Sequence, residues 1–465
     1  MKIQEILKLE DYGKIFDKLC VDNVEDRDID KNLENYEGKH DILNRLNESI
    51  GSAPEEKPDG TLTPDTRKTI ITTKLVLNLQ QKIVKMAVAF LFGSDVKIKL
   101  NNPEEPLKKA YQNMLLTYKN VKINSFNRKL AKACKSESKA AELWYITKDK
   151  DIRIILLCKK NGDDFYPHYD EHGDVDAITR RYASENEKGV LIEHNDIHMA
   201  KKVIYTTKRQ SGNSYEITEK ENSVGKIMII FSDQKKPDSA DVQTLIARLE
   251  MIISKLADSN DRNAFPILKA TGLIDTFPDK DSVGKVFTIK GEDTAAGGIS
   301  YGDVNYLVAP DAAESLTLEI DNLLRFVCWL TGTANISFDN IKGINSNLSG
   351  NSIKLMFLDP ISKAKDDQEI FGEHLDRRNN LMKAILLSLD VNERDNYKKL
   401  NLTNEFGSIL PESDMEKIQM LAESRPGENL IDKPTAVKNH PFVENADDVI
   451  AEMEKEEKLI GGQNV

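Results

Sequence analysis

Amphipathic helices are the clearest pattern of apolar and polar positions in the chain. Residues 238–262 carry one apolar stripe, made of Val242, Leu245, Ile246, Leu249, Ile252, Ile253 and Leu256. Residues 311–331 carry a second stripe, made of Leu316, Ile320, Leu323, Val327 and Leu330. Steps of three and four positions place each set on one face of a helix. Both segments are therefore predicted to be long helices.

The ends of these two segments carry helix signals. Asp238 and Asp241 stand near the start of the first helix, where carboxylates are favourable. Asp311 and Glu314 form a variant of the capping box at the start of the second. Gly332 follows the second stripe and can close that helix as its C′ residue.

Two further helical patterns are interrupted or ended by special residues. The longest covers about residues 350–389 and contains Pro360. A proline inside a helix removes a backbone donor and clashes with the preceding turn, so we expect a kink at this position. The other pattern, residues 72–98, predicts a mostly buried helix that ends at Gly93 and is followed by a short strand.

Strand-like runs fill other parts of the chain. Residues 140–235 alternate runs rich in Ile, Val and Tyr with NG, HG and SG pairs, which predicts antiparallel hairpins. Residues 263–310 show short strands and turns again. After a break at 391–410, two more helices are predicted over 411–424 and 444–460, and the end of the last is strongly acidic. The predicted fold class is α+β, mainly α, with several domains.

One polar stretch separates the second and third helical patterns. It is TGTANISFDNIKGINSNLSGNS, residues 331–352, and its charged residues are Asp339 and Lys342. Residues 311–331 hold four acidic side chains and one basic one, and residues 238–262 hold five and three. A loop of this length inside a compact domain is unusual unless it is functional. A solvated helical hairpin with a polar tip is the simpler alternative.

Composition narrows the class of protein. The chain has 465 residues, of which 39% are hydrophobic and 31% charged, and a formal net charge of −12. The basic footprint of a protein that grips duplex DNA is missing from this sequence. The low apolar content suits an elongated protein, or one whose burial is completed by partner subunits. The most apolar run, residues 86–92, is too short to span a bilayer, so no membrane association is expected.

Two histidine pairs have the spacing that offers two ligands to one zinc ion on a helix. They are His168 with His172 and His194 with His198. The first pair lies in turn-rich sequence, and a general-base glutamate in the right register is missing, so surface turns are the preferred interpretation. A His-based metal hydrolase is kept as an alternative, to be tested by zinc content.

Other catalytic motifs fail on their context. GISYG, residues 298–302, matches the G-x-S-x-G pattern with Ser300 as nucleophile, but a strand-like run follows it where a helix is required. FPDKDSVG, residues 277–284, resembles a calcium loop but has Lys290 in place of the bidentate glutamate. Phosphate-binding glycine motifs are missing from the sequence. We therefore predict no enzyme activity, no cofactor and no metal.

Six segments, in order along the chain, resemble the portal protein of tailed bacteriophages, in the family found in siphophage-type heads. They are NYEGKHDIL, NLQQKIVKMAVAFLFGSDVKI, DFYPHYDEHGDVDAITRRY, FSDQKKPDSADVQTLIARLEMIISKLADSN, NIKGINSNLSGNSIKLMF and the C-terminal segment that begins LPESDMEKIQMLAES. Two local departures are Met228, where the family often has proline, and Ser94-Asp95, which replaces a frequent Gly-x-Pro.

The resemblance implies a portal architecture of wing, stem, clip and crown around a central channel. It divides the chain into an N-terminal arm and wing (1–237), a stem helix (238–262), the clip (263–310), a second stem helix (311–331), the tunnel loop (332–351), a kinked wing helix (352–392) and a crown with a C-terminal helix (393–465).

On this resemblance the polar stretch becomes a loop that projects into the channel. Repeated around a ring, its near-neutral side chains would touch passing DNA weakly and release it. The implied DNA-facing residues are Asn335, Ser337, Asp339, Asn340, Lys342, Asn345, Ser346 and Asn347. The implied hinges are Gly332, Gly343 and Gly350, and the helix kink is placed at Pro360.

The resemblance also implies partners and location. Twelve copies would form a ring at one vertex of the phage head, assembled in the host cytoplasm. The ring would pass double-stranded DNA without sequence specificity and bind the terminase large subunit, a head-completion or adaptor protein, and the major capsid and scaffolding proteins. A different oligomeric virion component, such as a head–tail connector or baseplate protein, is the main alternative.

Overall fold

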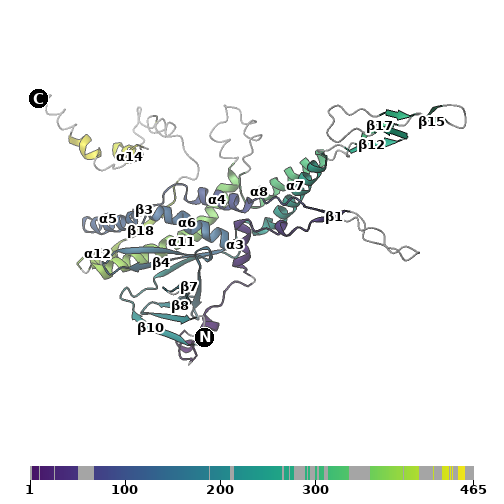
Figure 1. The fold of residues 1–465 in the computed structure, drawn as a ribbon. Coiled ribbons are helices and arrows are strands. Elements are labelled where there is room, and N and C mark those ends of the chain that lie inside the picture. Colours follow the sequence, from purple (N-terminus) through teal and green to yellow (C-terminus); the bar gives the residue numbers. More distant parts are fainter. Residues whose placement is uncertain are drawn as a thin grey trace.

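The computed structural model describes most of the chain. The described residues are 3–9, 11–25, 27–50, 68–187, 189–209, 214–263, 267–271, 273–276, 288–290, 292–293, 299–300, 303–307, 313–334, 357–390, 392–407, 423, 432–438, 440, 442–443 and 449–455. They form a mixed α/β body from which two long helices project side by side (Figure 1).

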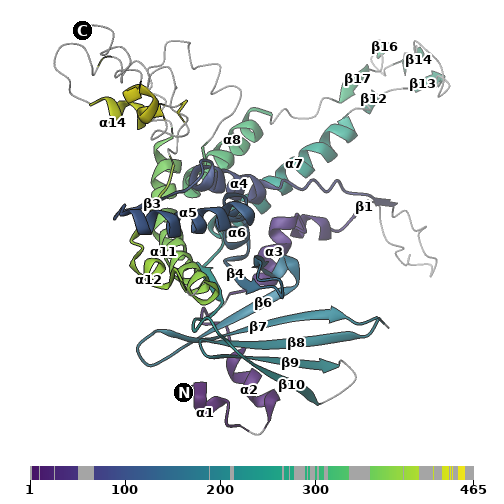
Figure 2. The ribbon, with the colours of Figure 1, turned by 90° about the vertical axis from the view of Figure 1, so that its left-hand side faces the viewer.

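Two antiparallel sheets occupy one side of the body (Figure 2). The larger has the order β10-β9-β8-β7-β6; its strands are β6 (Asp163–Tyr169), β7 (Val175–Glu185), β8 (Leu191–Met199), β9 (Lys202–Arg209) and β10 (Tyr215–Glu221). The smaller has the order β11-β4-β5; its strands are β4 (Lys139–Ile146), β5 (Ile152–Leu157) and β11 (Ile229–Asp233). The hairpins predicted over 140–235 are thus confirmed.

Both faces of the larger sheet are covered in part. Helices α1 (Ile3–Ile6) and α2 (Tyr12–Leu19) pack on one face, over residues such as Ile197. The opposite face presents Phe165 and Ile178 to the smaller sheet. Because side chains alternate along a strand, the two faces of β7 and β8 can serve two separate apolar clusters.

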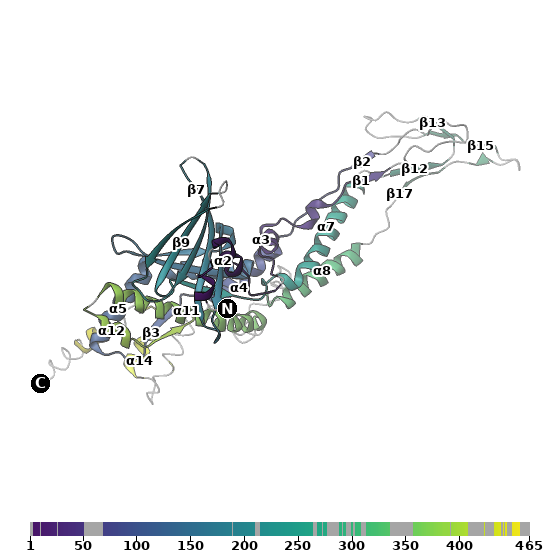
Figure 3. The ribbon, with the colours of Figure 1, turned by 90° about the horizontal axis from the view of Figure 1, so that it is seen from below.

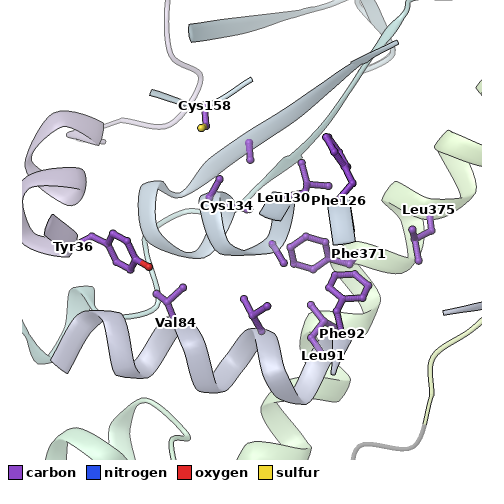
Figure 4. Close-up of a cluster of buried hydrophobic side chains, with 14 residues drawn as sticks. Tyr36, Val84, Leu91, Phe92, Phe126, Leu130, Cys134, Cys158, Phe371 and Leu375 are labelled. Carbon is purple, nitrogen blue, oxygen red and sulfur yellow. The ribbon is translucent and has the colours of Figure 1, made fainter. Parts of the chain in front are cut away.

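The other side of the body is a helical core. It contains α3 (Ile29–Glu37), α4 (Leu79–Phe92), α5 (Glu105–Asn120), α6 (Ile123–Glu137) and α11 (Leu358–Leu389). Figure 4 shows Phe92 of α4 beside Phe371 of α11, while Val84 lies farther along α4, next to Tyr36 of α3. The rings of Phe92 and Phe371 lie edge to face with centroids 5.6 Å apart, a favourable aromatic geometry.

The predicted helix over 72–98 is partly wrong. Helix α4 ends at Gly93 as expected, and β3 (Lys97–Leu100) follows it. The helix begins only at Leu79, and residues 71–78 form no helix or strand of their own. Their backbone binds instead to side chains of a projecting helix, as described below.

The predicted break at 391–410 is also wrong. Helix α12 (Arg394–Lys399) and strand β18 (Leu402–Glu405) lie within it, and β18 pairs with β3. Tyr397 and Leu400 are buried in the core beside α5 and α11. The chain beyond includes α14 (Lys433–Lys438), and residues 449–455 are helical within the predicted 444–460 helix. Apart from Glu423, the predicted helix over 411–424 lies outside the described residues.

The two projecting helices match the apolar stripes. They are α7 (Gln243–Asn263), preceded by a 3₁₀ turn at Ala240–Val242, and α8 (Ala313–Leu330). The predicted strand-and-turn module lies at their far end (Figure 3). Its pairs are β12 (Ile267–Thr271) with β17 (Asp303–Leu307), β13 (Leu273–Thr276) with β14 (Thr288–Lys290), and β15 (Glu292–Asp293) with β16 (Ile299–Ser300). The last short strands are β1 (Glu48–Ile50) and β2 (Lys68–Ile70), which pair with each other.

Pro360, where a kink is expected, lies at the start of the helix that the structure describes. Helix α11 begins at Leu358, so Pro360 lies in its first turn. Backbone N–H groups in the first turn have no carbonyl of the same helix to bind, and proline therefore costs little there. Residues 350–356, which the prediction included in this helix, lie outside the described residues.

A buried ion pair joins α11 to the smaller sheet. The Arg378 guanidinium donates to both carboxylate oxygens of Glu142, with Nε–O distances of 2.9 and 3.0 Å, and to Asn127 of α6. Trp144 and His374 also contact this carboxylate. Burial alone would raise the pKa of Glu142, but Arg378 and His374 hold it at about 2.

Replacing Glu142 with glutamine should therefore destabilise the body. The change leaves the buried Arg378 charge unpaired, and we expect the free energy of unfolding to fall by about 3–5 kcal/mol in urea denaturation. The matched control is Glu373→Gln, which removes an exposed i,i+4 partner of Arg377 and should cost less than about 0.5 kcal/mol. Equal, small effects of both changes would contradict the account.

Candidate functional site at the base of the two long helices

A cluster of four charged side chains anchors the start of α7 to the body. The carboxylate of Asp238 lies 2.8 Å from Nζ of Lys363 and 3.3 Å from Nζ of Lys135. Lys135 also contacts Asp367 at 2.6 Å. Lys135 comes from α6, whereas Lys363 and Asp367 stand four residues apart on α11 and so share a face. The cluster thus joins three segments that are far apart in the sequence.

The charged groups of this cluster are largely buried, which restricts how they can be arranged. The side chains of Lys135 and Asp238 are 0% and 8% exposed. Burial alone would raise the pKa of Asp238, but the two ammonium groups more than offset this and lower it. Burial likewise raises the pKa of Asp367, although Lys135 opposes the change. A buried ammonium that lost its carboxylate would carry a large desolvation penalty, so the four groups hold one another in place.

Lys363 also fixes the end of α8. Nζ of Lys363 donates to the carbonyl oxygen of Thr331 over 3.1 Å. Gly332 has φ +59°, and the N–H groups of Gly332 and Thr333 donate back to Trp329 and Cys328. This is a Schellman motif, in which a left-handed glycine satisfies the last carbonyls of the helix. The predicted C′ role of Gly332 is confirmed.

A polar seam along α7 holds the extended segment before α4. Glu250, Ser254 and Asp258 accept hydrogen bonds from the backbone N–H groups of Leu77, Leu75 and Thr73, over 2.8, 3.0 and 2.7 Å. Alternate residues of an extended chain are roughly 6.6 Å apart. Residues four apart on a helix are separated by roughly 6 Å along its axis. The two spacings match, which explains why residues 71–78 stay extended although their apolar pattern favours helix.

The NYEGKHDIL segment supplies a further contact with α7. Helix α3 ends at Gly38, which has φ +85°. The buried ring of His40 then lies 2.5 Å from a carboxylate oxygen of Glu250 and 2.7 Å from the carbonyl oxygen of Asn35. The two ring nitrogens thus contact one oxygen atom from α7 and one from α3. This segment therefore serves to attach α7 to the body.

The two long helices contact each other through one apolar cluster and one ion pair. Val242, in the 3₁₀ turn before α7, and Ile246 of α7 meet Val327 of α8 near the base. Farther out, Arg248 pairs with Glu319 at 2.8 Å. On the remaining surface of α8 the exposed large apolar side chains are Leu318, Phe326, Trp329 and Leu330. Trp329 alone is 69% exposed, which is unusual for so large an apolar residue.

The predicted channel residues cannot be placed. Asn335, Ser337, Asp339, Asn340, Lys342, Asn345, Ser346 and Asn347, together with Gly343 and Gly350, lie outside the described residues. Gly332 and Pro360 flank them, at the end of α8 and in the first turn of α11. The cluster around Asp238 therefore contacts both chain segments from which this stretch departs.

The histidine pairs do not form a common metal site. His194 and His198 lie on strand β8 and His168 on β6, not on a helix, and His172 is in the turn after β6. His168 binds Asp176 over 2.6 Å, and His194 binds Ser184 over 2.8 Å. Within the described ranges, no group of three potential ligands is arranged to hold a metal ion.

The structure also corrects the prediction for His194 and His198. His198 is buried, and burial lowers its pKa to about 4. The prediction that His194 and His198 lie in surface turns is therefore wrong. Two short motifs can be followed only in part: Ser300 lies in β16, while residues 277–284 are outside the described part of the chain.

Most of the anchoring residues were missed by sequence reasoning. Asp238 was noted as a favourable charge near a helix start, but its actual partners, Lys135 and Lys363, are remote in the sequence. The i,i+4 spacing of Lys363 and Asp367 could have indicated a shared face. The one signal for His40 was its place in a family-like segment.

Comparison with known proteins identifies the class. A family model described as phage portal protein, SPP1 Gp6-like, matches residues 18–462. The chain is thus a structural component of the bacteriophage virion that acts in DNA packaging. It belongs to the phage portal protein family of the SPP1 Gp6-like type. No curated protein matches the chain. Among the described helices, none combines the length and apolar character needed to cross a membrane.

Replacing Asp238 with asparagine should loosen the base of α7. We expect the free energy of unfolding at neutral pH to fall by about 2–3 kcal/mol, because Lys135 and Lys363 lose a buried carboxylate. Because the fold lowers the pKa of Asp238, its ionised carboxylate stabilises the protein at pH values above 3.8, the ordinary pKa of this group. That contribution disappears as pH falls through the folded-state pKa, so the two proteins should converge in acid.

The control for this change is Asp241→Asn, which removes an exposed pair with Lys236. It should cost less than about 1 kcal/mol at any pH. Urea denaturation at several pH values measures both. A pH-independent deficit in Asp238→Asn would argue against the ion cluster.

Replacing Gly332 with alanine should strain the end of α8. A side chain at φ +59° costs about 1–2 kcal/mol, and its Cβ would lie 3.3 Å from Cβ of Lys363. Gly372→Ala is the matched control, because it lies within α11 with open space around it and should stabilise by about 0.5–1 kcal/mol. Thermal unfolding of the two variants should therefore shift in opposite directions, and a shift in the same direction would contradict the Schellman assignment.

Proposed function

We propose that copies of this portal protein form a closed ring around a channel through which double-stranded DNA enters and leaves the phage head. Membership of the portal family is the observation that carries this proposal. A heterologous contact whose rotation closes generates a ring. The copy number proposed from the family resemblance is twelve.

The proposed domains follow the described elements, with the start of the crown moved. The sheets and the helical core, up to Asp233, would form the wing together with α11, α12 and β18. Helices α7 and α8 would form the stem, and the strands β12–β17 at their far end the clip. The crown would begin after Gly407 instead of at residue 393, because residues 392–407 pack into the body.

Exposed apolar side chains on α8 support burial against neighbouring copies. Leu318, Phe326, Trp329 and Leu330 are all exposed in the single chain. A contiguous apolar surface on a charged protein commonly marks an interface. In a ring of stems this surface of α8 would meet the next copy.

The stretch between α8 and α11 is the proposed DNA-facing loop. It departs from the ion cluster that holds both helices, so each copy would present it at the same height in the ring. Its near-neutral composition would favour weak, reversible contact with phosphates, and the acidic helices would repel them. Tight binding would oppose translocation.

The proposed partners are those of a portal vertex. The clip would bind the terminase large subunit during packaging, and a head-completion or adaptor protein afterwards. The wing would contact the major capsid and scaffolding proteins. ATP hydrolysis would belong to the terminase, in agreement with the lack of a P-loop in this sequence.

The native mass of the purified protein tests the ring. Twelve copies of 52.5 kDa would give about 630 kDa by light scattering, with a central hole in negative-stain images. Phe326→Ser/Trp329→Ser should shift this mass toward the monomer, whereas Leu116→Ser, an exposed apolar residue on α5, should not. A stable dimer or trimer without a hole, in the wild-type protein, would contradict the proposal.

A further inference from the structure

A basic hollow lies between β3, α5 and α6, at the end of the body away from the two long helices. Its volume is about 590 Å³, and its described lining residues all come from the range 95–128. Its apolar lining, here called the floor, includes Ile98, Leu115 and Ile123. Its charged lining consists of Lys97, Lys99, Lys119, Lys122, Arg128 and Asp95.

Three of these lysines have no carboxylate partner within the part of the chain that the structure describes. Lys99 pairs with Glu405 and Arg128 with Asp95, which leaves Lys97, Lys119 and Lys122. Lys122 also has φ +54°, a backbone conformation that residues with side chains rarely adopt. An apolar floor with an excess of free ammonium groups fits an acidic amphipathic segment.

The chain itself carries such a segment near its C-terminus. Residues 444–460 contain seven acidic side chains and two basic ones among apolar residues. Residues 449–455 are helical, so Val449, Ile450 and Met453 lie on one face by their spacing. Glu452 and Glu454 flank that face. An amphipathic helix with this pattern is suited to lie in an apolar groove with a basic rim.

The chain enters its C-terminal region beside the hollow. A Cβ atom added to Gly407 would touch Ser94 and lie 3.6 Å from the carbonyl oxygen of Asp95, so β18 leads the chain to the edge of the hollow. Figures 1 and 3 place α14 at the α5 end of the body, far from α7 and α8. Residues 449–455 follow Gly407 after 41 residues of the same chain, so docking would be an intramolecular event with an effective concentration set by the linkage.

We infer that the acidic helix around residues 449–455 docks into the basic hollow of its own chain. Lys119 and Lys122 pair with Glu452 and Glu454, and Ile450 covers the apolar floor beside Leu115. The inference concerns a single chain and is independent of whether copies close into a ring. The docked helix would tie the C-terminal region to α5 and α6.

Disulfide trapping in the full-length protein tests this docking. Leu115→Cys with Ile450→Cys should form an intramolecular disulfide under mild oxidation, detected by peptide mass. Leu116→Cys with Ile450→Cys is the matched control, because Leu116 is the next residue of α5 and points away from the hollow. Equal trapping at both positions, or a disulfide that joins two chains, would overturn the inference.

Charge reversal separates docking from chance collision. Lys119→Glu/Lys122→Glu should slow trapping roughly tenfold, because two attractive pairs become repulsive. Adding Glu452→Lys/Glu454→Lys should restore it. Lys129→Glu, an exposed site on α6 outside the hollow, should leave trapping unchanged. Lys119, Lys122 and Lys129 are exposed, so these substitutions should preserve the fold. Trapping at an unchanged rate after the charge reversals would contradict the inference.

Discussion

The structure depends most on the carboxylate of Asp238, which lies between two ammonium groups at the point where α7 leaves the body. Lys135 brings the end of α6 to this carboxylate, and Lys363 brings the start of α11. Because Lys363 also binds the carbonyl oxygen of Thr331, just after α8, both long helices and the start of α11 share one anchor. Each charge is tolerated in a buried position because the others are present.

Two other sets of contacts extend this anchor into a rigid base. The polar seam of Glu250, Ser254 and Asp258 fixes α7 along its length, and Glu142 with Arg378 fixes α11 to the smaller sheet. Two of the three seam acceptors, Glu250 and Asp258, are carboxylates, so their hydrogen bonds are charge-assisted and stronger than neutral ones. In the proposed ring, these contacts would give the proposed DNA-facing loop a firm support.

Much of the fold could be predicted from the sequence, and the failures have physical causes. The stripes of α7 and α8 and the Gly332 cap are local signals, and the structure confirms them. Residues 72–78 were assigned to a helix because their extended form depends on acceptors of α7 that are remote in the sequence. Strand β18 was missed because its partner β3 is some three hundred residues away.

The site was less predictable than the fold. Asp238 was noted for its place at a helix start, while its partners could not be identified without the tertiary contacts. The most direct test of the central claim is a density map of the assembled particle. The account predicts that α7 and α8 surround the axis, with residues 335–350 facing the channel at the level of the Asp238 cluster. A ring whose channel is lined instead by the five-stranded sheet, with α7 and α8 on the outside, would contradict it.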